Sequence, residues 1–241
     1  MNVKRLAESH HGYRQWSFSQ AHMSTWIHYR SMGICAGLVA HWIRDHAHDD
    51  SLVNELGSGG VAPLNIKKLR QIANDNRMWR TQRASSQDEQ ISLWLRNNGI
   101  DDLRTSGNFE RTVRIDYGYG RIIRSTSPGN NQIYEGVIGR SFRPMIENEI
   151  VNALAKYKSC YARVAFGGRM FGHSVAVWLG QPTWKSQGDA CFFDPNYGEY
   201  WFKEKRDFFN FFPVFYRAKY KNFPCYFGHF WDVAPCAKRV T

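Results

Sequence analysis

The chain has 241 residues, a formal net charge of +11, 43 % hydrophobic residues and 15 % aromatic residues. This composition excludes an intrinsically disordered chain, because it supplies enough apolar surface to bury a large core. It also argues against a membrane-spanning helix, since no run reaches the roughly 18 apolar residues that such a helix needs, and residues 1–20 lack the apolar core of a secretory signal peptide.

The first strong signal along the chain is the segment 33–38, Gly-Ile-Cys-Ala-Gly-Leu, which predicts a helix that begins at Cys35. Gly33 permits a tight turn before it. A cysteine in the first turn of a helix lies near the positive end of the helix dipole, which favours the thiolate. We therefore expect Cys35 to be a nucleophile. Apolar residues follow at helical spacing and share its face: Leu38, Val39, Trp42 and Ile43.

Polar residues lie on the opposite face of this predicted helix. His41, Asp45 and His48 have the spacing i, i+4 and i+7, so their side chains point the same way. The pattern is not a recognised set of metal ligands. We expect a charged, solvated face without a metal.

Two further helices are predicted in the first half. Residues 65–83 have a helical pattern. Ser86 and Glu89 form a capping-box pattern that opens another helix to about residue 95, and Gly99 is placed to end it.

Residues 112–143 differ in character and predict short strands and loops. Tyr117 and Tyr119 alternate with glycines in this region. These two aromatic side chains are candidates for lining a substrate groove.

The second half predicts a sheet with helices packed on it. Helices are expected at about 145–157 and over 208–216, where aromatic residues recur. A helical part followed by an antiparallel sheet is the α+β class, with a groove expected between the two parts. The predicted strands are 160–166, 172–179, 190–202 and about 223–233.

Two residues of the second half are suited to act with the Cys35 thiol. A thiol nucleophile needs a base that handles the proton and a group that holds this base in the correct tautomer. His173 begins one predicted strand, and we expect its ring to project towards the Cys35 helix. Asp194 ends the next strand, just before Pro195, where its carboxylate can accept from the imidazole. From the pattern alone, Cys35, His173 and Asp194 are either a catalytic triad or a buried thiol, a structural histidine and a turn residue.

Three motifs around these residues resemble those of the YopT/AvrPphB family of papain-like cysteine proteases. They are Gly-Ile-Cys-Ala-Gly-Leu-Val-Ala-His-Trp-Ile at 33–43, Gly-His-Ser-Val-Ala at 172–176 and Phe-Phe-Asp-Pro-Asn-Tyr-Gly-Glu-Tyr-Trp-Phe at 192–202. The resemblance implies a papain-like fold with Cys35 as nucleophile, His173 as base and Asp194 as orienting partner. It also implies a bacterial effector that cleaves particular host proteins.

On this basis we expect a single papain-like catalytic domain over residues 1–241. Its expected parts are an N-terminal segment at about 1–30, a mainly helical part at 31–157 and a sheet part at 158–241.

Two features depart from the family pattern. The connection 181–190 is longer than usual and polar apart from Trp184, so we expect a surface loop beside the groove, with Trp184 binding substrate. No oxyanion-hole side chain can be aligned upstream of Cys35, although its backbone N–H is expected to contribute. The side-chain candidates are Gln20, His28 and Arg30.

The cysteine pattern and the charge bear on compartment and partners. The five cysteines are odd in number and include no Cys-x-x-Cys pair, which predicts free thiols in a reducing compartment. Without a signal peptide, we expect secretion into a host cell by a specialised bacterial system. The basic charge favours a protein substrate that is acidic or membrane-proximal. No nucleic-acid-binding motif is present, and the predicted chemistry requires no cofactor.

The sequence leaves two alternatives open. The same triad also serves deamidases and transglutaminases, whose reactions on Gln or Asn side chains pass through a thioester and leave the polypeptide uncut. A non-enzymatic basic module that binds nucleic acid or an anionic membrane would show steep salt dependence and would not depend on Cys35.

Overall fold

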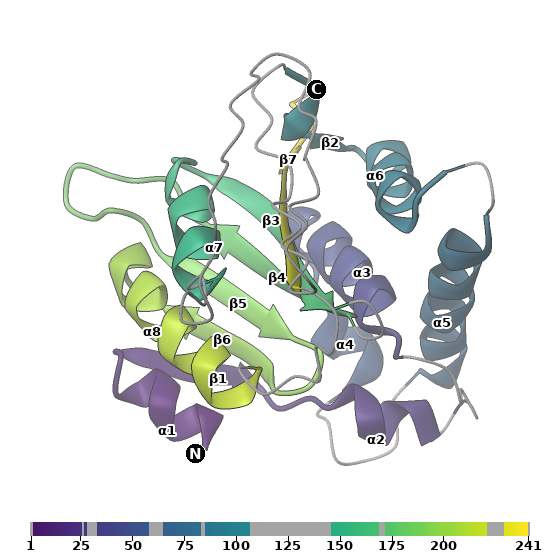
Figure 1. Ribbon diagram of the computed structural model, residues 1–241, viewed down its shortest axis with the longest axis horizontal. Helices are drawn as coiled ribbons and strands as arrows, with labels where there is room; N and C mark the ends of the chain where they lie inside the picture. The colour runs from purple at the N-terminus through teal and green to yellow at the C-terminus, as the bar shows by residue number, and fades with distance from the viewer. Residues whose placement is uncertain are drawn as a thin grey trace, which may run out of the picture.

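The computed structural model describes residues 2–25, 27, 33–57, 65–82, 85–106, 146–168, 172–220 and 229–240. Within these residues, seven strands form one antiparallel sheet in the order β1-β6-β5-β4-β3-β7-β2 (Figure 1). The strands are β1 (Gly12–Trp16), β2 (Ile100–Asp102), β3 (Cys160–Gly168), β4 (Gly172–Leu179), β5 (Ala190–Asp194), β6 (Gly198–Phe202) and β7 (His229–Lys238).

Helices cover both faces of this sheet, and each helical layer buries its own apolar cluster against the strands. This arrangement confirms the predicted α+β class. One layer contains α2 (Gln20–Thr25), α3 (Cys35–Ala47), α4 (Leu52–Leu56), α5 (Ile66–Thr81) and α6 (Gln87–Asn97). The other contains α1 (Val3–Glu8), α7 (Ile146–Ala155) and α8 (Lys205–Lys219), and a short 3-10 helix, η1 (Leu103–Ser106), follows β2.

Neighbouring residues of β5 show how one strand holds both layers. The side chain of Phe192 faces α8, where its ring centroid lies 5.2 Å from that of Phe215. Phe193 faces the other way and stacks on Trp42 of α3 at 5.8 Å. These side chains are fully buried or nearly so, and each contributes about 1.5–3 kcal/mol through burial. The period of two along β5 therefore fixes α3 and α8 on opposite faces of the same strand.

Five helices that the sequence predicts are confirmed as α3, α5, α6, α7 and α8. The capping box is present as predicted: the Ser86 side chain accepts from the Glu89 N–H, and the Glu89 carboxylate accepts from the Ser86 N–H. Gly99 follows α6 with a φ of +76°, a conformation that favours glycine.

The strand predictions need three corrections. The segment 190–202 is a hairpin of two strands, β5 and β6, because residues 195–197 form a turn. The final strand ends later than predicted, since β7 (His229–Lys238) continues past residue 233, and residues 223–228 of the prediction lie outside the described residues. The N-terminal segment supplies an edge strand, β1, which pairs with β6. Sequence analysis missed β1 because its three central residues are exposed and only its ends are buried.

Most of the polar face of α3 is not solvated: the expectation was wrong for His41 and Asp45, whereas His48 is exposed as expected. His41 is fully buried, with its Nε2 3.0 Å from an oxygen of Asp75 on α5. Asp45 is 4 % exposed and pairs with Arg44. The reason is that α5 and α6, which belong to the same layer, also pack against α3 and cover this face. Within the described ranges, no group of three or more His, Cys, Asp or Glu side chains could hold a metal ion.

Some predictions fall outside the described residues. The region 112–143, with Tyr117 and Tyr119, is among them. In the part of the chain that the structure describes, no helix is long and apolar enough to cross a membrane.

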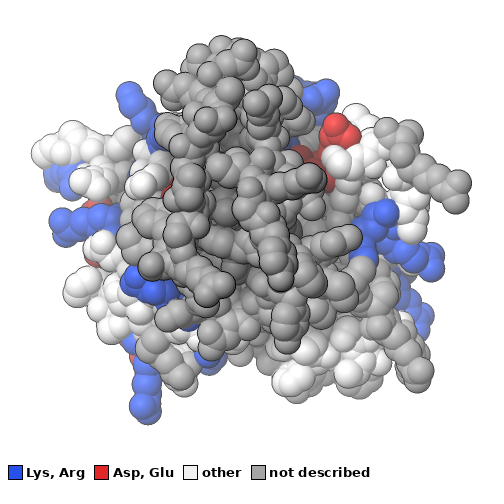
Figure 2. Space-filling view, in the orientation of Figure 1, with Lys and Arg blue, Asp and Glu red and all other residues white. Residues whose placement is uncertain are grey.

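The described surface reflects the basic composition. Figure 2 shows Lys and Arg side chains around the rim of one face, with few Asp and Glu side chains between them. Helix α5 exposes Lys67, Arg70 and Arg77. Such a surface attracts anionic partners.

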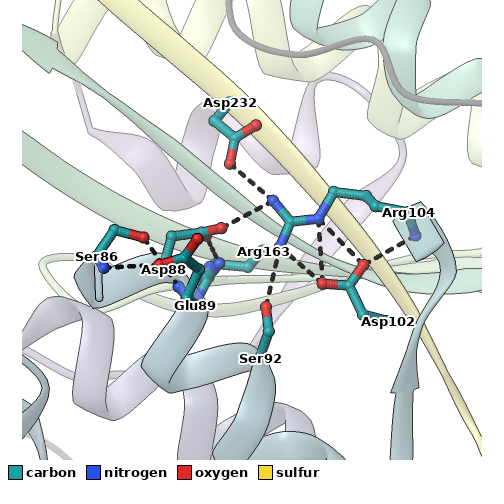
Figure 3. A network of polar contacts seen from close by, with 8 residues as sticks. All are labelled: Ser86, Asp88, Glu89, Ser92, Asp102, Arg104, Arg163 and Asp232. Atoms are coloured by element: carbon teal, nitrogen blue, oxygen red, sulfur yellow. Dashed lines mark hydrogen bonds and ion pairs between the residues drawn. The ribbon is translucent and has the colours of Figure 1, made fainter. Parts of the chain in front are cut away.

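A largely buried charge network joins α6 to strands β2, β3 and β7 of the sheet (Figure 3). Asp88 in the first turn of α6 forms ion pairs with Arg163 of β3 and with Arg104 of η1. Arg104 also pairs with Asp102 of β2 at 2.7 Å and with Asp232 of β7 at 3.4 Å. The network thus connects a helix and three strands.

Candidate active site

The first turn of α3 is positioned by its neighbours. Gly33, just before the helix, has a φ of +67°, and Ile34 provides no capping side chain. The cap comes instead from Asn76 of α5, whose Oδ1 accepts from the Gly37 N–H at 3.1 Å and whose Nδ2 donates to the Gly33 carbonyl at 3.3 Å. Asn76 is 1 % exposed. Because a buried amide holds both sides of Cys35, the thiol has a defined position at the helix start.

Gly37 allows this close contact between α3 and α5. A Cβ at this position would lie 2.8 Å from the Ile72 carbonyl oxygen and 2.9 Å from the Asn76 Cβ. Any larger residue would push the two helices apart and move the Cys35 turn. The glycine that follows Cys35 in the motif is therefore a packing requirement.

The hairpin of β4 and β5 brings the imidazole and the carboxylate together. His173 is the second residue of β4, and Asp194 is the last residue of β5. The His173 Nε2–H donates to Asp194 Oδ1 at 3.1 Å, and both side chains are buried. The Asn196 N–H donates to the same oxygen at 2.7 Å. Backbone and imidazole together thus hold the carboxylate in place.

Cys35 lies against the other side of His173. Burial raises the pKa of the thiol, but a hydrogen bond from the His173 side chain and the charge of its imidazolium outweigh burial, and the pKa is lowered. The N–H groups of Ser174 and Ala36 also donate to the sulfur. Since Nε2 of His173 faces Asp194, the nitrogen left for the thiol is Nδ1.

The pKa of His173 moves the opposite way. Burial lowers it, but the Asp194 carboxylate and the Cys35 thiolate raise it to about 10. The pair therefore favours thiolate and imidazolium together at neutral pH. The structure brings Cys35, His173 and Asp194 together.

The other described cysteines have different surroundings. Cys160, Cys191 and Cys236 are buried, and burial raises the pKa of each thiol, that of Cys160 to about 12. All four described cysteines are free thiols. Cys35 is the partly accessible one among them and the one with a lowered pKa.

Gln20 bridges the two halves of the site. Its Oε1 accepts from the Ile34 N–H at 3.2 Å, and its Nε2 donates to Asn196 Oδ1 at 2.7 Å. It therefore ties the start of α3 to the turn that follows Asp194. The other oxyanion-hole candidates, His28 and Arg30, lie outside the described residues.

Trp184 is not beside these residues, so its predicted place in the groove was wrong. Strands β4 and β5 are antiparallel, with Leu179 opposite Ala190, so their connection lies at the end away from His173 and Asp194. The six residue steps from His173 to Leu179 span about 20 Å at 3.3 Å per step. Trp184 is 89 % exposed at that distant end.

Sequence analysis missed Tyr220, the C-cap of α8. Its hydroxyl donates to Asp194 Oδ2 at 2.8 Å, and its ring stacks on that of His173. The available signal was the spacing of Phe212, Tyr216 and Tyr220, which continues the buried stripe of α8 by steps of four.

Comparison with known proteins places these features in context. A family model described as Yersinia/Haemophilus virulence surface antigen matches residues 5–224. The chain is similar to cysteine protease yopT1 of Yersinia enterocolitica serotype O:8, at 26 % identity over 181 residues, covering 73 % of this chain and 47 % of that protein. It is similar to YopT of Yersinia pestis at 25 % identity over 183 residues, with the same coverage. The chain thus spans about half the length of the curated relatives it matches.

Two solved structures are also similar. The Pseudomonas avirulence protein AvrPphB has 12 % sequence identity and a TM-score of 0.47, and the match covers 83 % of this chain and 90 % of that one. PatoxP, a cysteine protease-like domain of the Photorhabdus asymbiotica toxin PaTox, has 13 % identity and a TM-score of 0.40, covering 98 % of this chain and 56 % of that one.

Proposed function

Because this chain belongs to the family described as Yersinia/Haemophilus virulence surface antigen, we propose that it is a cysteine protease that works through Cys35, His173 and Asp194. Family membership agrees with the resemblance seen in the three sequence motifs. The curated relatives with which it aligns are named cysteine proteases. The observation that carries the proposal is a thiol with a lowered pKa against an imidazole that a buried carboxylate orients.

The geometry supports a two-step acyl transfer. The Cys35 thiolate attacks the carbonyl carbon of the scissile peptide bond, and the His173 imidazolium gives its proton to the leaving amine. A thioester to Cys35 remains. His173 then takes a proton from water, whose oxygen attacks the thioester carbonyl, and the carboxylic acid product leaves as the thiol pair is restored. Asp194 keeps the ring in its tautomer throughout.

The start of α3 is suited to stabilise the oxyanion of each tetrahedral intermediate. In the first turn, the Gly37 N–H is bound to Asn76 and the Ala36 N–H to the Cys35 sulfur. Among the described residues, no acceptor is assigned to the Cys35 N–H. This N–H points from the positive end of the helix and is our proposed oxyanion donor.

The substrate that we propose is a host protein that is acidic or membrane-proximal. The support is the excess of Lys and Arg, which raises the encounter rate with anionic partners. We propose delivery into a host cell by a specialised bacterial system, where the reducing cytosol keeps the free thiols reduced. We also propose that residues 1–241 form a single papain-like catalytic domain.

The test is cleavage by the purified protein in a host-cell lysate, followed by mapping of new protein N-termini. The wild type should create new N-termini, and Cys35→Ser and His173→Ala should create none above the blank. His48→Ala is the matched control, because His48 is exposed and caps the C-terminal end of α3, the opposite end of the helix from Cys35. Substrates that gain mass at Gln or Asn without a new N-terminus would instead identify a deamidase or transglutaminase. Activity that survives Cys35→Ser would overturn the assignment.

A further inference from the structure

We propose that Tyr220 is a positioning residue of the active site, which fixes the Asp194 carboxylate and covers one face of the His173 ring. The inference rests on the proposed function, because it assigns a role to Tyr220 in the reaction of Cys35 and His173. The evidence for it is a set of contacts that no other described side chain makes with both residues.

The first contact fixes the carboxylate. The Tyr220 O–H donates to Asp194 Oδ2 at 2.8 Å, while the Asn196 N–H and His173 Nε2–H occupy Oδ1. Both oxygens of this fully buried carboxylate are therefore held by named donors. Since a carboxylate with one free oxygen can rotate about its Cβ–Cγ bond, the hydroxyl is what keeps Oδ1 directed at the imidazole.

The second contact covers the imidazole. The ring centroids of Tyr220 and His173 lie 5.1 Å apart with an interplanar angle of 24°, which is a stacked arrangement. Tyr220 is 4 % exposed, and Phe166 packs edge-on against both rings. A phenol ring on this face excludes water from the hydrogen bond between His173 and Asp194. An imidazolium and carboxylate interact more strongly in such a site than in water.

The third contact connects Tyr220 to the nucleophile helix. Asn196 Nδ2 donates to the Tyr220 hydroxyl oxygen at 3.2 Å, and Asn196 Oδ1 accepts from Gln20 Nε2. Gln20 Oε1 in turn accepts from the Ile34 N–H, next to Cys35. This chain of hydrogen bonds runs without a break from the start of α3 to Oδ2 of Asp194. In this chain of hydrogen bonds, Tyr220 is the residue that contacts both Asp194 and His173.

The test compares two substitutions at this position with a matched control. Tyr220→Phe keeps the stacked ring and removes the hydroxyl, and Tyr220→Leu removes both. Tyr200→Phe is the control, because its buried hydroxyl donates to the Tyr197 carbonyl at 2.9 Å and touches none of the three active-site residues.

Two readouts report on positioning rather than on folding. The first is the proton NMR signal of the His173 Nε2–H, which a strong hydrogen bond to a carboxylate moves downfield and protects from exchange. The second is the pH at which half of Cys35 reacts as thiolate with iodoacetamide. Thermal unfolding of each variant checks the fold.

We expect Tyr220→Phe to broaden the His173 signal and to move the Cys35 midpoint to higher pH. On a cleaved substrate, kcat should fall about 10- to 100-fold, as for other residues that orient a catalytic group, with KM nearly unchanged. Tyr220→Leu should be more severe, and Tyr200→Phe should match the wild type. If Tyr220→Phe folds and leaves both the signal and the midpoint unchanged, the proposal is wrong.

Failure of the proposed function would look different. The wild type would then cleave nothing, and Cys35 would not react selectively. The NMR signal of His173 needs no turnover, so it still decides whether Tyr220 holds Asp194. Should Tyr220→Leu not fold, Tyr220→Phe alone carries the test.

Discussion

Replacing Asp88 by alanine should destabilise the fold through Arg163. Asp88 is the carboxylate that pairs with Arg163, whose side chain is 4 % exposed. Burial already lowers the pKa of this guanidinium, which shows that the site is unfavourable for its charge. One terminal nitrogen of Arg163, Nη1, has no hydrogen-bond partner among the described residues. Asp88→Ala would leave a buried cation without its ion-pair partner, and the Asp232 carboxylate would be the main favourable charge that remains near it.

The magnitude follows from the exposure of each partner. Breaking a buried ion pair from one side costs about 3–5 kcal/mol, because the remaining charge stays buried. Asp88 is 39 % exposed, so water can solvate Arg163 in part once the carboxylate is gone. We therefore expect Asp88→Ala to lower the free energy of unfolding by about 3 kcal/mol, the lower end of this range. Arg104 loses less, since it keeps Asp102 and Asp232. Arg163→Met removes the buried charge itself and should change stability by less than about 1 kcal/mol.

The assay is a double-mutant cycle measured by urea unfolding. In the wild-type background, Asp88→Ala should lower the free energy of unfolding by about 3 kcal/mol. In the Arg163→Met background it should lower it by about 1 kcal/mol, because Asp88 then contributes only its interaction with the helix dipole and its contact with Arg104. The coupling energy should therefore be about 2 kcal/mol. Equal costs in both backgrounds would refute the reasoning, because the ion pair would then contribute nothing.

Three other predictions concern the active site. Asp194→Asn keeps the side-chain shape but removes the charge that raises the His173 pKa. We expect the pH at which half of Cys35 reacts as thiolate, measured by alkylation kinetics, to rise. An unchanged value would show that the Asp194 carboxylate only orients the His173 ring. Because the His173 pKa is raised to about 10, its protonated ring should stabilise the fold fully below pH 6.5 and should lose this effect as the pH rises to about 10. The free energy of unfolding of the wild type should therefore exceed that of His173→Gln by more at pH 6 than at pH 10. The same difference between the two proteins at both pH values would contradict this prediction. Trp184→Ala should leave Cys35 alkylation unchanged, since Trp184 lies at the distant end of the hairpin, whereas a slower reaction would place it at the site.

The helices were predictable because their signals are local. Glycine before Cys35, apolar spacing after it and the capping box at Ser86 each depend on residues within one or two turns. His173 and Asp194 were predicted as partners of Cys35 because thiol chemistry requires a base and an orienting group, and because the motifs around all three residues resemble those of the YopT/AvrPphB family.

Features that depend on packing between distant elements were not predictable. The buried polar face of α3 results from α5, whose Asp75 partners His41. Tyr220 reaches Asp194 only because α8 packs across the sheet and ends there. The error about Trp184 had a different cause. Trp184 lies between His173 and Asp194 in the sequence, but the connection of an antiparallel hairpin is at the opposite end from the first residue of one strand and the last residue of the next.

The most direct test of the central claim is selective alkylation of Cys35 at mildly acidic pH. The protein is treated briefly with iodoacetamide, and each cysteine is then located by peptide mass spectrometry. We predict that Cys35 is labelled well before Cys160, Cys191 and Cys236, whose pKa values are raised by burial. His173→Ala should abolish this preference, because it removes the imidazolium that stabilises the thiolate. Equal labelling of these thiols, or selective labelling that survives His173→Ala, would contradict the assignment of Cys35 and His173 as a reactive pair.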